Sequence, residues 1–183
     1  MLKAFDPLDA IAPAPFAAPF AVRPAEPCAR FSLRIDPASL AQASEAFGLS
    51  IPSRIGGVEG EEGRRAVCVG PDEWFLFCRP RDGAALPALF AALPAPLSLV
   101  EVSDRECALL VEGPRAAYAL MAVCPLDLEA MAAGTATRTL FDKVAVLLVK
   151  ETPERFRLEF WRSYAAHVHG LLETIGRELA AGL

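Results

Sequence analysis

The residues of this chain most able to do chemistry are its two histidines and five cysteines. His167 and His169 lie two residues apart in a predicted helix, where side chains point about 200° apart around the axis, so one metal ion cannot bind both. The cysteines are scattered and form no Cys-x-x-Cys pair that would bind metal or exchange disulfides; they are Cys28, Cys68, Cys78, Cys107 and Cys124. A nucleophilic pair such as Cys124 with His167 needs an electropositive setting, which the sequence does not offer. We therefore predict no catalytic residue and no metal site.

The glycine-rich segment 56–63 is the one stretch to test as a phosphate-binding loop. It carries Glu59, Glu61 and Glu62, has no basic residue, and runs into a predicted strand. A phosphate site needs free backbone N–H groups at a helix start and a positive potential, so this segment is interpreted as a mobile surface loop. No Gly-x-Gly-x-x-Gly motif follows a predicted strand. We therefore predict no cofactor-binding residue in this chain.

Five residues remain as candidates for contact with another protein: Asp104, Arg105, Trp161, Arg162 and Tyr164. Asp104 and Arg105 form either a simple hairpin turn or an interface contact. Trp161 and Tyr164 bracket the start of the last predicted helix, where large aromatic residues belong either to the core or to a binding surface. Arg162 lies between them and is placed to pair with a carboxylate of a neighbouring subunit, since arginine and aromatic residues are typical interface anchors.

Composition excludes several kinds of partner. The chain has 183 residues, 54% of them hydrophobic, and a net charge of −5, so we expect no contact with nucleic acid. We also expect no membrane contact, because no apolar run reaches the roughly 20 residues that cross a bilayer. Prolines interrupt the N-terminal apolar segment where a secretion signal would need a continuous helix. Scattered cysteines indicate reduced thiols, which predicts a cytoplasmic protein.

Two regions are predicted along the chain. Residues 1–27 form an arm rich in proline and alanine, a composition that favours an extended backbone. The arm is either a disordered tail, a segment lying on its own domain, or a strap over another subunit anchored by Phe5, Phe16 and Phe20. Residues 28–183 are predicted to form a single α+β domain, with helices on a mixed or antiparallel sheet.

Apolar periodicity places the elements of that domain. Strands are predicted at 28–35, 64–69, 74–78, 97–103, 106–112, 137–140, 143–150 and 156–161. Helices are predicted from the Asp36 cap to Phe47, over 82–93, after Gly113-Pro114, and after the Ser163 cap. The strands 97–103 and 106–112 are expected to form a hairpin around Asp104 and Arg105.

Several segments, in one consistent order, carry a family resemblance. The longest is Leu99–Ala116, LVEVSDRECALLVEGPRA, and the others are Gly70–Leu76, Cys124–Leu128, Arg138–Phe141, Arg155–Leu158 and Trp161–Tyr164. In this order they resemble the γ subunit of heterotetrameric sarcosine oxidase, over about residues 65–175. The succession of strand, polar turn, strand ending in Gly-Pro and alanine-rich helix also resembles the folate-binding core of glycine-cleavage aminomethyltransferases.

The resemblance implies an aminomethyltransferase-like fold in a subunit of an oxidoreductase complex. Such a complex oxidatively demethylates sarcosine to glycine and passes the one-carbon unit to tetrahydrofolate. Its FAD, FMN, NAD and tetrahydrofolate are expected in partner subunits, which are larger flavoprotein α and β subunits and a small δ subunit. This chain is then expected to be a non-catalytic structural subunit that binds no cofactor.

The strand after Thr139-Leu140 departs from the aminomethyltransferase pattern. Those enzymes place a Gly-Gly turn and a strand with paired carboxylates there, whereas this chain has the apolar run 144–149 and keeps Asp142 only at the turn. Apolar side chains cannot transfer a proton, which favours the structural subunit. The alternative is a stand-alone folate-binding or aminomethyltransferase-like protein, which needs a pterin-sized pocket with an inward carboxylate.

Overall fold

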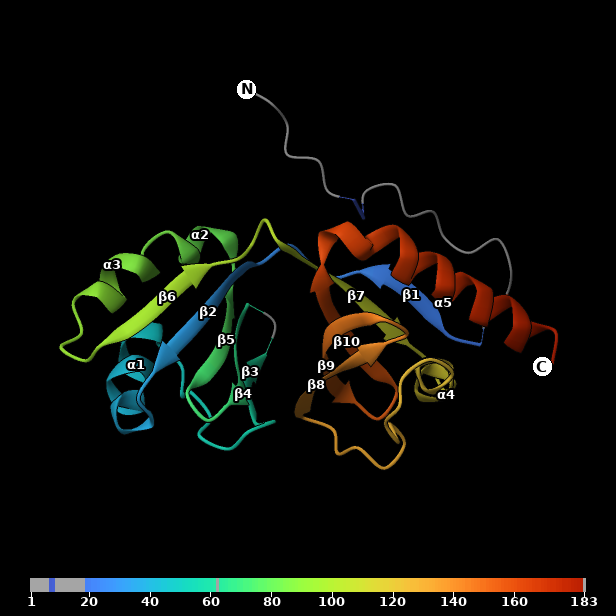
Figure 1. The fold of residues 1–183 in the computed structure, drawn as a ribbon, viewed down its shortest axis with the longest axis horizontal. Helices are drawn as coiled ribbons and strands as arrows, with labels where there is room; N and C mark the ends of the chain where they lie inside the picture. Colours follow the sequence, from blue (N-terminus) through green and yellow to red (C-terminus); the bar gives the residue numbers. More distant parts are fainter. Residues whose placement is uncertain (1–6, 9–18, 62, 183) are drawn as a thin grey trace, which may run out of the picture. The chain divides into compact units, whose positions relative to one another are not determined.

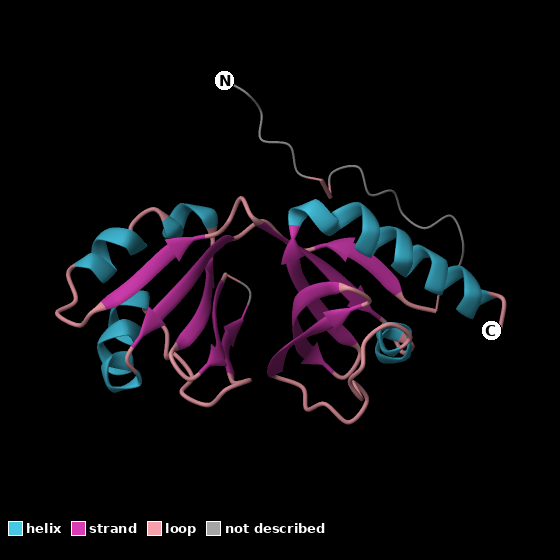
Figure 2. Ribbon diagram, in the orientation of Figure 1, coloured by secondary structure: helices cyan, strands magenta, loops and turns pink. Residues whose placement is uncertain are grey.

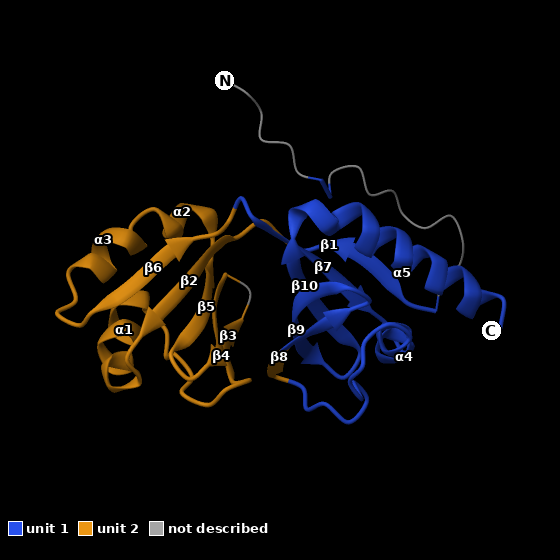
Figure 3. Cartoon of the chain, in the orientation of Figure 1, with its two compact units in different colours: residues 1–25, 104–133, 138–183 blue, residues 26–103, 134–137 orange. Residues whose placement is uncertain are grey.

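The structure, a computed structural model, describes residues 7–8, 19–61 and 63–182. The chain divides into two compact units (Figure 3). Unit 1 comprises Met1–Ala25, Asp104–Ala133 and Arg138–Leu183, and unit 2 comprises Glu26–Ser103 and Gly134–Thr137. Each unit has its own five-stranded sheet and its own hydrophobic core. That residues 28–183 fold as one domain stays a prediction.

The sheet of unit 2 has the strand order β3-β4-β5-β2-β6 (Figure 1). Its strands are β2 (Ala29–Ile35), β3 (Val58–Glu61), β4 (Arg64–Gly70), β5 (Glu73–Cys78) and β6 (Leu97–Glu101). Neighbouring strands pair antiparallel. Alternation along β2 places Phe31 and Leu33 on the core face and the exposed Arg34 on the other face.

Three helices pack on the core face of this sheet: α1 (Leu40–Phe47), α2 (Pro80–Gly83) and α3 (Leu86–Ala91). Asp36 accepts a hydrogen bond of 2.9 Å from the Ala38 N–H, at the start of a short 3-10 turn that leads into α1. Gly48 ends α1 in the left-handed conformation, with φ of +72°. Asp36 therefore caps the 3-10 turn and not α1 itself, which begins at Leu40 without a side-chain cap, whereas the end of α1 at Gly48 is as predicted.

The sheet of unit 1 has the strand order β1-β7-β10-β9-β8. Its strands are β1 (Ala21–Pro24), β7 (Glu106–Glu112), β8 (Thr135–Phe141), β9 (Val144–Thr152) and β10 (Arg155–Trp161), and the first three residues of β8 are grouped with unit 2. The helices α4 (Ala116–Met121) and α5 (Ala165–Ala180) cover the core face, and α5 buries the stripe Val168, Leu172 and Ile175. Figure 2 shows the helices and strands of both units. The predicted α+β class is confirmed. No helix in the described part of the chain is long and apolar enough to span a membrane.

The hairpin predicted around Asp104 and Arg105 is wrong. β6 pairs with β2 in unit 2, whereas β7 pairs with β1 and β10 in unit 1, so these consecutive strands belong to different sheets. β7 is buried along most of its length and has a strand on each side, while β6 is half exposed and forms a sheet edge. Periodicity identified both strands but carries no information about their partners.

Three other predicted elements also differ. The helix expected over 82–93 is two short helices, because Pro87 inside one continuous helix would clash with the carbonyl of Gly83. The glycine-rich segment is not all loop, since Val58–Glu61 form β3 and pair with β4. Ser163 does not cap α5: it lies within the 3-10 turn Arg162–Tyr164, and α5 begins at Ala165 without a side-chain cap.

The N-terminal arm is structured near its end. Ala21–Pro24 form β1 and pair with β7, and Phe20 is buried in the core of unit 1. Pro24 is tolerated there because β1 is an edge strand, whose outer side needs no N–H donor. Phe20 therefore packs on the chain's own unit, while Phe5 and Phe16 lie outside the described residues.

Candidate functional site

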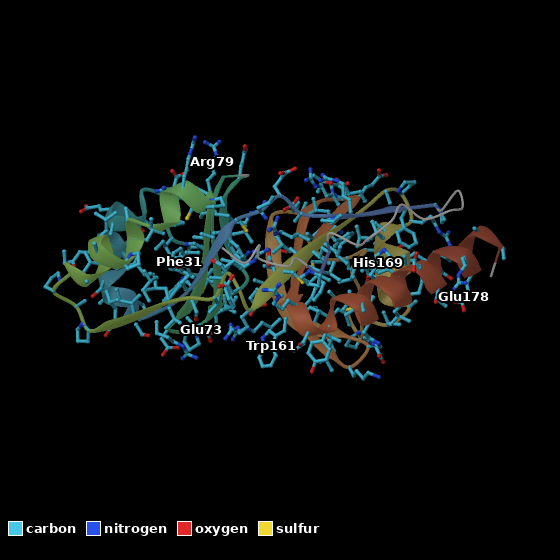
Figure 4. The ribbon with its side chains drawn as sticks, turned by 90° about the horizontal axis from the view of Figure 1, so that it is seen from above. Phe31, Glu73, Arg79, Trp161, His169 and Glu178 are labelled. Atoms are coloured by element: carbon cyan, nitrogen blue, oxygen red, sulfur yellow. The ribbon has the colours of Figure 1, made fainter. Side chains whose placement is uncertain are left out.

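An exposed tryptophan lies at the last residue of β10 in unit 1. Trp161 is opposite Glu106 of β7, is 53% exposed, and projects outward from the ribbon (Figure 4). The Cζ of Arg105 lies 5.7 Å from the centroid of the Trp161 ring. The same guanidinium pairs with Glu106 at 2.9 Å between Nη2 and Oε1. The structure thus presents an aromatic ring beside a cation that is already oriented.

Arg162 connects the end of β10 to the segment that precedes β7. Its backbone N–H donates to the Arg105 carbonyl at 2.9 Å, and its Nη1 donates to the Asp104 carbonyl at 3.1 Å. Asp104 therefore contributes its backbone oxygen to this contact. Tyr164 follows in the same 3-10 turn and is 40% exposed. We call these residues, Asp104, Arg105, Trp161, Arg162 and Tyr164, the Trp161 cluster.

The structure removes the other interpretation that the sequence left open for four of these five residues. Asp104 and Arg105 are not a hairpin turn, and Trp161 and Tyr164 are exposed instead of belonging to the core. Tryptophan, tyrosine and arginine are the residue types most enriched in the energetic centres of protein interfaces. Contact of the Trp161 cluster with a partner stays a prediction.

A second exposed pair of this kind, at the start of α4 in unit 1, was missed in the sequence. The Cζ of Arg115 lies 4.1 Å from the ring centroid of Tyr118, which is 45% exposed. The spacing could have revealed it, because residues three apart on a helix lie on the same side. Tyr118 provides a matched control for Trp161.

The two histidines are directed at different carboxylates. His167 Nε2 lies 2.9 Å from Asp142 Oδ2, and His169 Nδ1 lies 3.7 Å from Glu173 Oε2. Asp142 forms the turn between β8 and β9 with φ of +54°, the structural role predicted for it. Among the residues that the structure describes, no three His, Cys, Asp or Glu side chains are grouped to hold a metal ion.

The cysteines are free, and Cys28 is the least buried of the five. Burial raises the pKa of the Cys78 thiol to about 11 and also raises the pKa of Cys68. Both thiols are therefore protonated at neutral pH, a form that is a poor nucleophile and a poor metal ligand. Cys124 Sγ lies 3.7 Å from Thr139 Oγ1, whereas His167 Nε2 is directed at Asp142.

β9 directs apolar side chains into the core of unit 1. Val144, Val146 and Leu148 belong to the buried cluster, on the strand where the aminomethyltransferase pattern has carboxylates. These side chains cannot take up a proton or stabilise a cationic intermediate. The structure thus agrees with the departure noted in the sequence.

Lys150, next on the same face of β9, is a buried cation that the sequence analysis missed. It is 5% exposed, and its Nζ donates to the carbonyls of Leu128 at 2.7 Å and Glu129 at 3.3 Å. The ammonium also lies 5.4 Å from the ring centroid of Phe156. Lys150 therefore anchors the loop between α4 and β8 to the sheet. A single lysine that ends an apolar strand is too common a pattern to have indicated this role.

Comparison with known proteins identifies relatives over most of the chain. No protein-family model matches it. The chain is 31% identical over 159 residues to the sarcosine oxidase subunit gamma of Corynebacterium sp. (strain U-96), across 83% of this chain and 77% of that protein. It is 34% identical over 141 residues to the same subunit of Corynebacterium sp. (strain P-1), across 74% of this chain and 68% of that protein. The chain belongs to the sarcosine oxidase gamma subunit family.

Solved structures agree with this gamma subunit family. The heterotetrameric sarcosine oxidase from Corynebacterium sp. U-96, in complex with pyrrole 2-carboxylate, has a chain that matches with a TM-score of 0.80 and 26% identity, over 88% of this chain and 85% of that one. The glycine cleavage system aminomethyltransferase T from Bartonella henselae matches with a TM-score of 0.63 and 12% identity, over 85% of this chain and 45% of that one. The second match shows the fold alone. The resemblance to gamma subunits seen in the sequence is confirmed, as is the aminomethyltransferase-like fold.

Proposed function

We propose that this chain is a non-catalytic, structural gamma subunit of a heterotetrameric sarcosine oxidase. The observation that carries the proposal is the 31% identity over 159 residues to a sarcosine oxidase subunit gamma. The TM-score of 0.80 to a chain of a heterotetrameric sarcosine oxidase supports the same kind of assembly. The assembly oxidatively demethylates sarcosine to glycine and passes the one-carbon unit to tetrahydrofolate.

The partners in this proposal are larger flavoprotein α and β subunits and a small δ subunit. FAD, FMN, NAD and tetrahydrofolate are assigned to those chains. The chemistry of the described residues supports this division of work: the histidines pair with separate carboxylates, the thiols of Cys68 and Cys78 are protonated, and β9 is apolar where a folate enzyme has acidic residues. The free cysteines support a cytoplasmic assembly.

The Trp161 cluster is the surface we assign to partner contact in unit 1. Arg162 is already hydrogen-bonded to the backbone of Asp104 and Arg105, so binding immobilises few additional side-chain torsions there. An exposed tryptophan buries a large apolar area when a partner covers it. Together these features match the rigid aromatic anchor of an interface hot spot.

Co-expression tests this proposal. The chain is produced together with candidate α, β and δ chains, and the mixture is separated by size-exclusion chromatography while flavin absorbance and sarcosine-dependent oxygen uptake are followed. We expect the chain to co-elute with the flavoproteins and the activity to require it. A fully active assembly that forms without this chain would overturn the proposal. Saturable micromolar binding of tetrahydrofolate by the isolated chain would instead support the stand-alone folate-binding alternative.

A further inference from the structure

The strand β6 is an unprotected edge of the sheet in unit 2. It pairs with β2 from Leu97 to Glu101, and the described residues of the unit supply no strand on its other side. Alternate residues of an edge strand direct their N–H and C=O groups outward, ready to pair with an added strand. Natural edge strands are commonly blocked by lysine, proline or a bulge, and β6, with the sequence LSLVE, has none of these.

A groove lined by residues with apolar side chains runs along this edge, on the helix-covered side of the sheet. Its volume is ≈ 300 Å³, and it is lined by Pro87, Phe90 and Ala91 of α3 and by Leu97 and Leu99 of β6. Because side chains alternate along a strand, Leu97, Leu99 and Glu101 lie on the same face. An added strand would therefore direct every second side chain into the groove.

Charge along this surface restricts what can bind. Residues 83–100 contain no charged side chain, so the groove favours uncharged, apolar side chains. At its end the exposed Glu101 accepts a hydrogen bond of 2.8 Å from the Ser103 hydroxyl, which leaves its negative charge to be neutralised by a cation. This face of β6 therefore carries two apolar side chains, Leu97 and Leu99, followed by the acidic Glu101. Its complement is a strand with two apolar side chains and one basic side chain at alternate positions.

We propose that β6 accepts an extended segment of another subunit of the complex, which adds to the sheet as a further strand. Two of its apolar side chains lie over Leu97 and Leu99, and a lysine or arginine lies opposite Glu101. A second copy of this chain fits less well, because β6 contains no basic residue and self-pairing leaves Glu101 without a counter-ion. The inference rests on the proposed function, because the complex supplies the partner.

Hydrogen exchange tests the added strand in the assembled complex. The outward-facing amides of residues 97–101, which do not pair with β2, should exchange at least about tenfold more slowly in the complex than in the isolated full-length chain. Glu101→Lys, which reverses an exposed charge, should weaken binding of the chain to its partner subunits by about tenfold. Glu59→Lys is the matched control, because Glu59 is an exposed carboxylate on β3, the opposite edge of the same sheet, and it should leave binding unchanged.

A photoreactive benzoyl-phenylalanine in place of Val100, which is 52% exposed, identifies the occupant. The expected crosslink is to a partner-subunit peptide with alternating apolar residues and a lysine or arginine in register. A crosslink to a second copy, or to residues 1–20 of the same chain, would overturn the inference, as would an assembled complex in which 97–101 exchange at the free rate. In that last case the chain still enters the complex and the proposed function stands. If the chain does not enter the complex at all, both proposals fail.

Discussion

The Trp161 cluster of unit 1 and the β6 edge of unit 2 are two surfaces built for different kinds of contact. The cluster presents an aromatic ring and two guanidinium groups held by an ion pair and by backbone carbonyls. The β6 edge presents backbone groups beside a groove lined by uncharged, apolar side chains. In our proposals the first surface selects a partner by side-chain shape and charge, and the second selects one by backbone pairing. Because of this difference, substitutions and changes in salt concentration should affect the two contacts differently.

The largest effect is expected from emptying the groove floor. Phe90 is 1% exposed and lines the groove while belonging to the core of unit 2. Phe90→Ala should lower the free energy of unfolding by about 3–5 kcal/mol, because a large cavity replaces the ring. Chemical denaturation of the isolated chain measures this loss. The exposed Leu89, one residue earlier and 47% exposed, is the control, and Leu89→Ala should change stability by less than about 1 kcal/mol. Equal losses from the two variants would show that Phe90 does not support the groove.

The Trp161 cluster should show the reverse, a loss of binding without a loss of stability. Trp161→Ala should weaken binding to the partner subunits by about 2 kcal/mol, roughly 30-fold, because the ring is an interface anchor. The melting temperature should stay nearly unchanged, since the residue is 53% exposed. Titration of labelled chain against partner subunits purified without it measures the affinity. Tyr118→Ala, at the other exposed ring stacked by an arginine, should change it less than about threefold. Equal effects at both rings would remove the special role of Trp161.

A smaller effect is expected from substitutions of Arg105 in the Trp161 cluster, which distinguish the contribution of the planar guanidinium group from that of its charge. Arg105→Lys keeps the positive charge but loses the planar group over the Trp161 ring, so we expect binding to weaken by about 1 kcal/mol, roughly fivefold. Arg105→Gln should in addition reduce the dependence of the association rate on salt. Glu101→Lys at β6 provides the comparison in the same stopped-flow measurement. If Arg105→Gln leaves the salt dependence as it is in the unchanged chain, the cluster does not contact a charged partner surface.

The smallest effect concerns β1, an edge strand of unit 1, which an ion pair connects to the neighbouring β7. Glu112 binds Arg23 of β1 at 2.8 Å, and this hydrogen bond holds the pKa of Glu112 below its ordinary value. A carboxyl group whose pKa is lower in the folded state stabilises the fold above its unfolded pKa, and that stabilisation is lost as pH falls through the folded pKa. Glu112→Gln should therefore remove at most about 1 kcal/mol at pH 7 and nothing at acid pH below the folded pKa. Thermal unfolding of both chains across the acid range checks this. A constant difference at all pH values would contradict it.

Local elements were the part of the fold that sequence patterns predicted well. The Asp36 cap, the Gly48 stop and the strands of β2, β4, β5 and β10 depend on residues close together in the chain. The pairing of β6 and β7 was not predictable in this way, because β6 pairs with β2 and β7 pairs with β10, and both partners are distant in the sequence. The break before α3 was missed because the apolar pattern over 82–93 is continuous, although Pro87 disfavours a single helix there.

For the candidate site too, the residue types were predictable from the sequence but the contacts between them were not. Residue types alone singled out Trp161, Arg105 and Arg162, but their mutual contacts depend on β7 lying beside β10. The groove along β6 was not visible in the sequence, since alanines, leucines and prolines over residues 83–100 look like any buried segment. Only the edge position of β6 leaves that apolar segment available for contact.

The central claim is that this chain works as a structural subunit of a sarcosine oxidase. The most direct measurement compares sarcosine-dependent oxygen uptake of the complex assembled with the unchanged chain, with Trp161→Ala, and without the chain. We predict full activity with the unchanged chain. With Trp161→Ala, activity should be lost on dilution as the variant dissociates. Without the chain, the assembly should be incomplete or inactive. A complex of the other subunits that is intact and fully active without this chain would contradict the account.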